Sequence, residues 1–123
     1  MIRLLLVYPL RITCELLTAV LHAESDICVA GFVNSSNEAL TEVTKQRCNT
    51  VLFDVNLSDH QGLLLTRKLH QIDPDIKVLV TGLVTSNRAI LHFIEEGVDG
   101  YVLEDESLAD LVKRSVPYTR IDF

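Results

Sequence analysis

Short apolar runs alternate with amphipathic segments along the whole chain, and this alternation limits the possible folds more than any other feature. Runs of four to six mostly apolar residues are typical of buried strands, and apolar residues spaced three or four apart are typical of helices. The predicted strands are residues 2–7, 27–32, 50–55, 76–81 and 100–103, and the predicted helices are 10–23, 63–72 and 86–96, with two more that begin at Ser35–Ser36 and Ser107. The pattern therefore predicts five consecutive strand–helix units.

Five such units are typical of an α/β domain with a parallel sheet and helices on both faces. Right-handed crossovers leave few topologies, and we expect a flavodoxin-like (βα)5 three-layer sandwich with strand order 2-1-3-4-5. In that order the carboxyl ends of the first and third strands border the crevice in which such folds place their sites. The candidate site residues are therefore Tyr8, Pro9, Asp54 and the loop after Asp54.

Length and charge restrict the class of protein. The chain has 123 residues, enough for one core, and we expect one domain over residues 1–116 with residues 117–123 as a tail or the start of a linker. Eleven basic against 17 acidic residues give a net charge of −6, so the domain lacks the basic patch needed to bind a nucleic-acid backbone. No apolar run is long enough to span a membrane and no signal peptide is visible, so we expect a cytoplasmic protein.

Metal and nucleotide motifs are absent from the sequence. The three cysteines are odd in number, widely spaced and without a C-x-x-C motif, so we interpret them as small buried hydrophobic residues. The four histidines lie on different predicted elements, and no glycine-rich phosphate loop occurs. We therefore expect neither a metal centre nor a bound cofactor.

Three segments resemble a known family. They are VLFDVNLSDHQGL (51–63), DPDIKVLVTG (73–82) and EEGVDGYVLEDESLADLV (95–112). At this spacing they resemble a response-regulator receiver domain, most closely of the NarL/LuxR type, and the resemblance covers essentially the whole chain. In that family an aspartate after the third strand accepts a phosphoryl group from a sensor kinase. This aspartate binds Mg²⁺ together with two acidic residues after the first strand and a backbone carbonyl.

The resemblance implies a role for four residues. Asp54 is at the phosphoacceptor position, and the backbone carbonyl of Asn56 is at the position of a metal ligand. Thr81 and Tyr101 are the hydroxyl and the aromatic that move together when the acceptor is phosphorylated. Asp54 also fits a structural role, in which its carboxylate accepts backbone N–H bonds from the following loop.

Three residues depart from the family pattern. Tyr8 and Pro9 replace the acidic pair, and Glu104 replaces the phosphate-binding lysine. One carboxylate of three remains for Mg²⁺, which prefers near-octahedral oxygen ligands, and Glu104 places a negative charge where the family has a positive one. We therefore expect weak or absent Mg²⁺ binding and weak or absent phosphorylation of Asp54. Arg11 either pairs with Asp54 or lies in solvent.

These expectations combine into an atypical receiver domain that is not an enzyme. It would act in two-component-type signalling or transcription regulation through protein contacts, independently of Mg²⁺-dependent phosphorylation. The expected partner is a second copy, another protein or a sensor kinase, bound on the face of the fourth helix, fifth strand and last helix near Phe93, Tyr101 and residues 108–112. We expect no direct contact with membrane or nucleic acid, although a DNA-binding domain could follow in a longer chain. Two alternatives remain open: a receiver still phosphorylated on Asp54 with weak metal binding, and a small-ligand sensor in the vacated pocket beside Tyr8 and Thr81.

Overall fold

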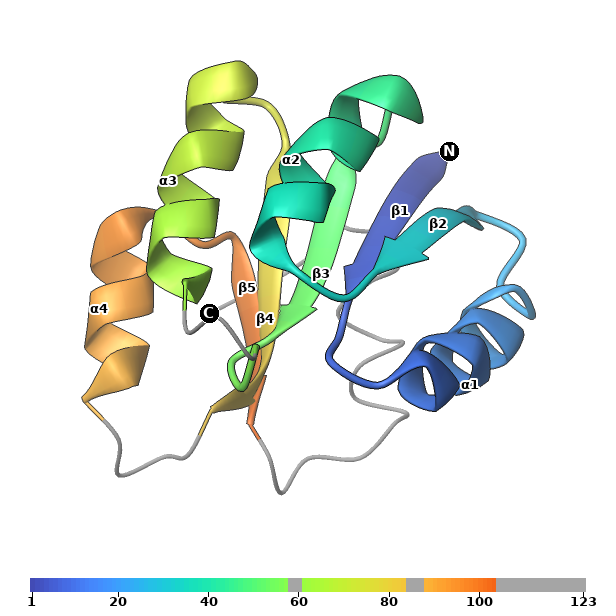
Figure 1. Ribbon diagram of the computed structural model, residues 1–123, viewed down its shortest axis with the longest axis horizontal. Coiled ribbons are helices and arrows are strands. Elements are labelled where there is room, and N and C mark those ends of the chain that lie inside the picture. The colour runs from blue at the N-terminus through green and yellow to red at the C-terminus, as the bar shows by residue number, and fades with distance from the viewer. Residues whose placement is uncertain (58–60, 84–87, 104–123) are drawn as a thin grey trace.

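The computed structural model describes residues 1–57, 61–83 and 88–103. The five strands in these residues form one parallel sheet in the order β2-β1-β3-β4-β5 (Figure 1). They are β1 (Ile2–Val7), β2 (Ile27–Val33), β3 (Thr50–Asp54), β4 (Lys77–Leu83) and β5 (Gly100–Leu103). The predicted flavodoxin-like strand order is therefore confirmed.

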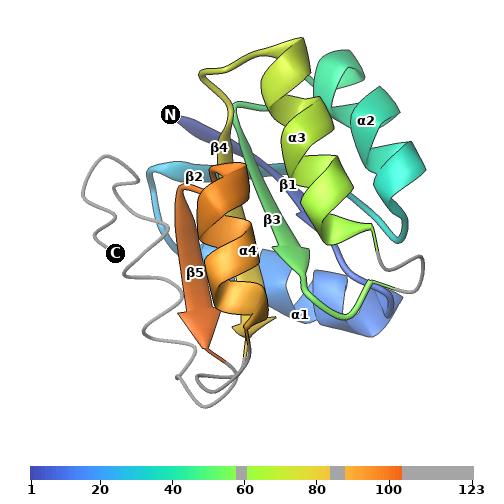
Figure 2. The same ribbon diagram turned by 90° about the vertical axis from the view of Figure 1, so that its left-hand side faces the viewer.

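Four helices lie in the described part of the chain: α1 (Arg11–Leu21), α2 (Ser36–Lys45), α3 (Gly62–Ile72) and α4 (Ala89–Glu96). Both views show α2, α3 and α4 side by side along the sheet (Figures 1 and 2). The last predicted helix, from Ser107, and the predicted tail of residues 117–123 lie outside the described residues. None of the four described helices is long and apolar enough to cross a membrane.

The two faces of the sheet are covered by different helices, because successive side chains of a strand point to opposite faces. Leu5 and Val7 of β1 pack into a core cluster with residues of α2, α3 and α4. Leu4 and Leu6 pack into a second cluster with residues of α1. All four side chains are fully buried, which confirms the prediction that the first strand is covered on both faces.

Helix α1 buries fewer apolar residues than its spacing indicates. Leu21 is fully buried and Leu17 packs against the core, but Leu16 is 63% exposed. Each helical residue turns the chain by about 100°, so Leu16 points away from the face that Leu17 presents to the sheet. The apolar spacing of residues 10–23 therefore indicates a helix but does not place Leu16 in the core. The three cysteines are free and are buried or half-buried, as predicted.

The strand register brings the candidate residues to one edge of the sheet. Phe53 of β3 pairs with Val7 of β1, and Asp54 pairs with Thr81 of β4. Since Tyr8 directly follows Val7, the residues Tyr8, Asp54 and Thr81 lie on three neighbouring strands at their carboxyl ends. Strand β4 continues beyond the predicted end at Thr81 as far as Leu83, with a register shift between these two residues.

Candidate functional site at the carboxyl edge of the sheet

Asp54 ends β3 with a half-buried carboxylate. Its Oδ1 accepts a hydrogen bond from the backbone N–H of Asn56 at 3.2 Å, and its backbone oxygen accepts one from the N–H of Leu57 at 3.2 Å. Burial raises the pKa of Asp54 above its ordinary value, and the hydrogen bond from Asn56 opposes this shift. These contacts match the structural role expected for Asp54, in which the carboxylate holds the turn after β3.

Gly82 allows β4 to pass close to this carboxylate, and the sequence analysis did not single it out. A Cβ atom at position 82 would lie 2.9 Å from Asp54 Oδ1, and the backbone there has a φ of +90°. A side chain at this position would therefore strain the backbone and displace the Asp54 carboxylate. The available signal was a glycine directly after the apolar run of the strand, which often marks a bulge or a close backbone approach.

Tyr8 fills the space between the ends of β1 and β4. Its side chain is 5% exposed, and its backbone N–H donates to the carbonyl of Val33 at 3.1 Å. The Tyr8 hydroxyl lies 2.7 Å from Thr81 Oγ1, and Thr81 Oγ1 also donates to the carbonyl of Phe53 at 3.4 Å. Burial raises the pKa of Tyr8, while the hydrogen bond with Thr81 lowers it and the charge of Asp54 raises it further. The phenol therefore keeps its proton at neutral pH.

Arg11 does not pair with Asp54. Its Nε lies 2.9 Å from Glu15 Oε1, and its guanidinium lies 6.0 Å from the centre of the Phe32 ring. The Arg11 side chain therefore lies in solvent, which is the second of the two arrangements expected for it. None of the ion pairs within the described residues involves Asp54, so its negative charge has no cationic neighbour there.

The described residues offer few ligands for the Mg²⁺ ion that the resemblance implies. Asp54 supplies one carboxylate, and Asn56 supplies a backbone carbonyl. The Tyr8 and Thr81 hydroxyls are hydrogen-bonded to each other. Pro9 contributes no side-chain oxygen, and Glu104 lies outside the described residues. In the described part of the chain, no group of three or more His, Cys, Asp or Glu side chains is placed to hold a metal ion. Among the described residues, one carboxylate and one backbone carbonyl are therefore in reach of a Mg²⁺ ion, which typically binds one or two carboxylates and several waters.

Phe93, which was expected near the partner face, is buried. Phe93 is 4% exposed, and its ring centre lies 5.9 Å from that of Phe53, so it belongs to the core and not to the surface. The exposed apolar residues of α4 are instead Leu91, at 61%, and Ile94, at 47%. Tyr101 of β5 is half-buried and packs against the core. Residues 108–112 lie outside the described part.

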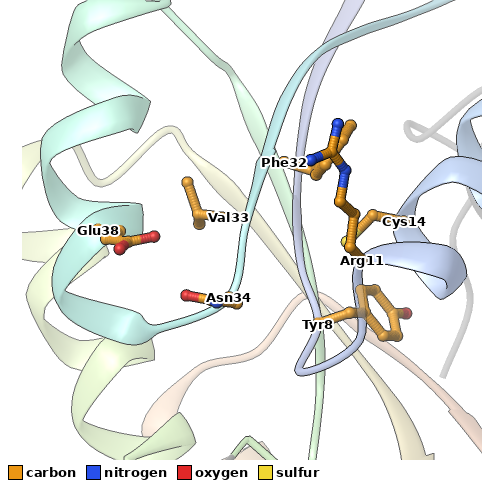
Figure 3. Close-up of a pocket in the computed structure, with 7 residues that line it drawn as sticks. All are labelled: Tyr8, Arg11, Cys14, Phe32, Val33, Asn34 and Glu38. Carbon is orange, nitrogen blue, oxygen red and sulfur yellow. The ribbon is translucent and has the colours of Figure 1, made fainter.

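A small pocket lies beside Tyr8, on the side of β2. It encloses about 170 Å³ and is lined by Tyr8, Arg11, Cys14, Phe32, Val33, Asn34 and Glu38. Figure 3 shows Arg11 beside Phe32 on one side of it and Asn34 and Glu38 on the other. Neither Asp54 nor Thr81 lines it, so it is not the vacated pocket expected from the sequence. Its volume is below the roughly 300–1,000 Å³ of typical ligand pockets.

Comparisons with known proteins agree with this geometry. The profile of a family described as the response regulator receiver domain matches residues 5–115. The DNA-binding transcriptional activator DevR/DosR of Mycobacterium tuberculosis is 32% identical over 105 residues, which cover 85% of this chain and 48% of that protein. Protein-glutamate methylesterase/protein-glutamine glutaminase 1 of Syntrophus aciditrophicus is 33% identical over 111 residues, which cover 89% of this chain and 31% of that protein. The chain thus spans less than half the length of these two curated relatives.

Solved structures show the same fold. A two-component response regulator of the LuxR family from Aurantimonas sp. SI85-9A1 superposes with a TM-score of 0.86. The match covers 94% of this chain and 83% of that one, with 22% sequence identity. At this identity the likeness establishes a shared architecture.

Proposed function

The chain belongs to the response regulator receiver domain family of two-component signalling, and from this premise we propose that it is an atypical member. Its output would depend on protein contacts and not on Mg²⁺-dependent phosphorylation of Asp54. In this proposal Asp54 keeps the acceptor position and Asn56 the carbonyl position. Thr81 and Tyr101 keep the positions of the switch residues. The substitutions Tyr8, Pro9 and Glu104 remove the metal ligands and the positive charge that phosphorylation of Asp54 would need.

The hydrogen bond between Tyr8 and Thr81 is the observation that supports this proposal most strongly. The resemblance implies a carboxylate and a metal ion beside Asp54, and Tyr8 instead places a buried ring there. Its hydroxyl, 2.7 Å from Thr81 Oγ1, engages the side chain that would contact a phosphoryl oxygen. Phosphoryl transfer depends on positioning and on neutralising negative charge, and this arrangement favours neither.

Electrostatics support the same proposal. Asp54 is half-buried without a cationic neighbour among the described residues, and the sequence places Glu104 directly after β5. A phosphoryl group adds further negative charge to such a site. Two like charges about 4 Å apart cost about 4 kcal/mol at an effective dielectric constant of about 20. We therefore propose that Mg²⁺ binds weakly or not at all and that phosphorylated Asp54 does not accumulate.

The proposed partners are proteins. Residues 1–116 would form a cytoplasmic receiver without enzymatic activity of its own, and residues 117–123 would lead out of it. We propose a second copy of the chain as the partner on the face of α4 and β5, where Leu91 and Ile94 are exposed. A sensor kinase is a further possible partner, and any contact with DNA would belong to another domain, as the relative DevR/DosR is a DNA-binding activator.

Intact-mass spectrometry after incubation with acetyl phosphate and Mg²⁺ tests the proposal. Wild type and Asp54→Asn should both remain unmodified. A triple variant, Tyr8→Asp, Pro9→Asp and Glu104→Lys, restores the acidic pair and the lysine and is the matched control. It should gain a phosphoryl group that depends on Mg²⁺, because both the ligands and the compensating charge return. A phosphoryl adduct on the wild type that Asp54→Asn abolishes would contradict the proposal.

A further inference from the structure

We infer that Tyr8 is a positioning residue: it holds Thr81, and with it the carboxyl end of β4, in one conformation without any phosphoryl group on Asp54. The inference rests on the proposed function, because a receiver that does not await phosphorylation needs another way to define this strand end. Three features of the structure carry it: the short hydrogen bond between the two hydroxyls, the burial of Tyr8, and the irregular backbone of β4 directly after Thr81.

The hydrogen bonds place Thr81 between two partners. The Tyr8 hydroxyl lies 2.7 Å from Thr81 Oγ1, a distance typical of a good O–H···O bond in which either hydroxyl can donate. The carbonyl of Phe53 lies 3.4 Å from Thr81 Oγ1, so this contact is the longer and weaker one. Tyr8 therefore provides the shorter of these two hydrogen bonds of Thr81.

Tyr8 holds Thr81 from a rigid position. Its ring is buried in the core cluster that α1 covers, and its backbone N–H is bonded to Val33 of β2. Pro9 follows directly, and its ring restricts the backbone after the end of β1. The phenol therefore has few alternative conformations, and little conformational entropy opposes its bond with Thr81.

The backbone of β4 becomes irregular directly after Thr81. Thr81 itself pairs with Asp54 of β3 and Val102 of β5, and its carbonyl accepts the backbone N–H of Val55 at 2.9 Å. Between Thr81 and Leu83 the ladder to β5 shifts register, and Gly82 adopts a φ of +90°. The Tyr8 hydroxyl therefore adds a side-chain contact at the last residue before this irregularity. Val80, next to Thr81, pairs with Tyr101, so the contact lies close to β5.

A double-mutant cycle tests the inference. Tyr8→Phe removes the hydroxyl and keeps the ring, Thr81→Val removes the partner hydroxyl and keeps the shape, and Thr81→Ser keeps the hydroxyl. Tyr8→Phe should lower the folding equilibrium constant about two- to tenfold, which is the range for one net hydrogen bond. The same substitution should have little effect in the Thr81→Val background, since the partner is already gone. Urea unfolding of the four proteins of the cycle gives this coupling.

A second readout separates positioning from general stabilisation. In backbone amide spectra, Tyr8→Phe and Thr81→Val should shift or broaden the same resonances of β4 and β5, and Thr81→Ser should leave them close to the wild type. Additive effects in the cycle, or unchanged β4 and β5 resonances in Tyr8→Phe, would overturn the inference. Phosphoryl labelling of the wild type would overturn the proposed function, but it would not alter the coupling. The two failures are therefore distinguishable.

Discussion

Asp54 carries a negative charge that its surroundings stabilise only weakly. The carboxylate is half-buried, accepts one backbone hydrogen bond from Asn56, and has no ion-pair partner among the described residues. Burial outweighs the hydrogen bond, so the pKa of Asp54 is raised. The carboxyl group therefore binds its proton more tightly in the folded protein than in the unfolded chain.

The raised pKa predicts how stability depends on pH. Because the folded state binds the Asp54 proton more tightly, the contribution of Asp54 to the free energy of unfolding falls as pH rises through the folded pKa. Asp54→Asn should then be more stable than the wild type at pH 7, and the difference should be small because solvent screens a group that is half exposed. The difference should shrink as pH falls towards the ordinary aspartate value of 3.8.

Urea unfolding of both proteins from pH 7 down to acid checks this prediction. Asp26→Asn, at an exposed position in the turn after α1, is the matched control and should change stability little at any pH. A less stable Asp54→Asn at pH 7 would mean that an unrecognised interaction stabilises the charged carboxylate.

At the scale of elements, helix α2 begins with a favourable capping residue and is followed by a residue with an unfavourable backbone conformation. Ser35 caps the amino end, where its Oγ accepts the backbone N–H of Glu38 at 3.3 Å, which confirms the helix start predicted from the sequence. Lys45 ends the helix, and Arg47 adopts a left-handed φ of +53°. Glycine is the usual residue for this conformation, so the structure carries local strain at Arg47.

Arg47→Gly should relieve that strain and raise the free energy of unfolding by about 1 kcal/mol. Arg47→Ala removes the same side chain but keeps the penalty for a positive φ, so it is the control and should remain near the wild type. Chemical denaturation of the three proteins measures both effects. Equal stability of the glycine and alanine variants would show that the backbone conformation contributes nothing.

At the scale of the whole molecule, two exposed apolar patches compete as contact surfaces. Leu91 and Ile94 lie on α4, while Ile12 and Leu16 lie on α1, at 63% exposure each. The contact between two copies that we propose would use α4, because α4 precedes β5 in the chain and packs into the same core cluster as Tyr101. The patch on α1 then provides a control of similar chemistry and exposure.

Replacing Leu91 and Ile94 with lysine should abolish self-association with little effect on folding, because exposed side chains change stability by about 0.5 kcal/mol or less. The matched variant with lysine at positions 12 and 16 should still associate. Sedimentation over a range of concentrations measures this. A wild type that stays monomeric throughout, or an α1 variant that loses association while the α4 variant keeps it, would contradict the assignment to α4.

Individual residues show where sequence reasoning succeeded and failed. Strand β1 was predicted with its full extent, since its short apolar run is followed directly by Tyr8 and Pro9. Phe93 was placed near the expected partner face and is buried against Phe53, because helical spacing shows that an apolar stripe exists but not how the helix is rotated towards the sheet. Gly82 was missed for a similar reason, since its importance comes from Asp54, 28 positions earlier in the chain.

The sequence by itself determined the order of strands and helices, the parallel sheet and the group of positions at its carboxyl edge. These features follow from periodicity, which is local, and from the few topologies that right-handed crossovers permit. Only the tertiary structure decided that Tyr8 bonds to Thr81, that Arg11 turns to Glu15, and that Asp54 has no cationic neighbour among the described residues. Those contacts join side chains far apart in the chain or choose between competing partners, and distances in space decide such choices.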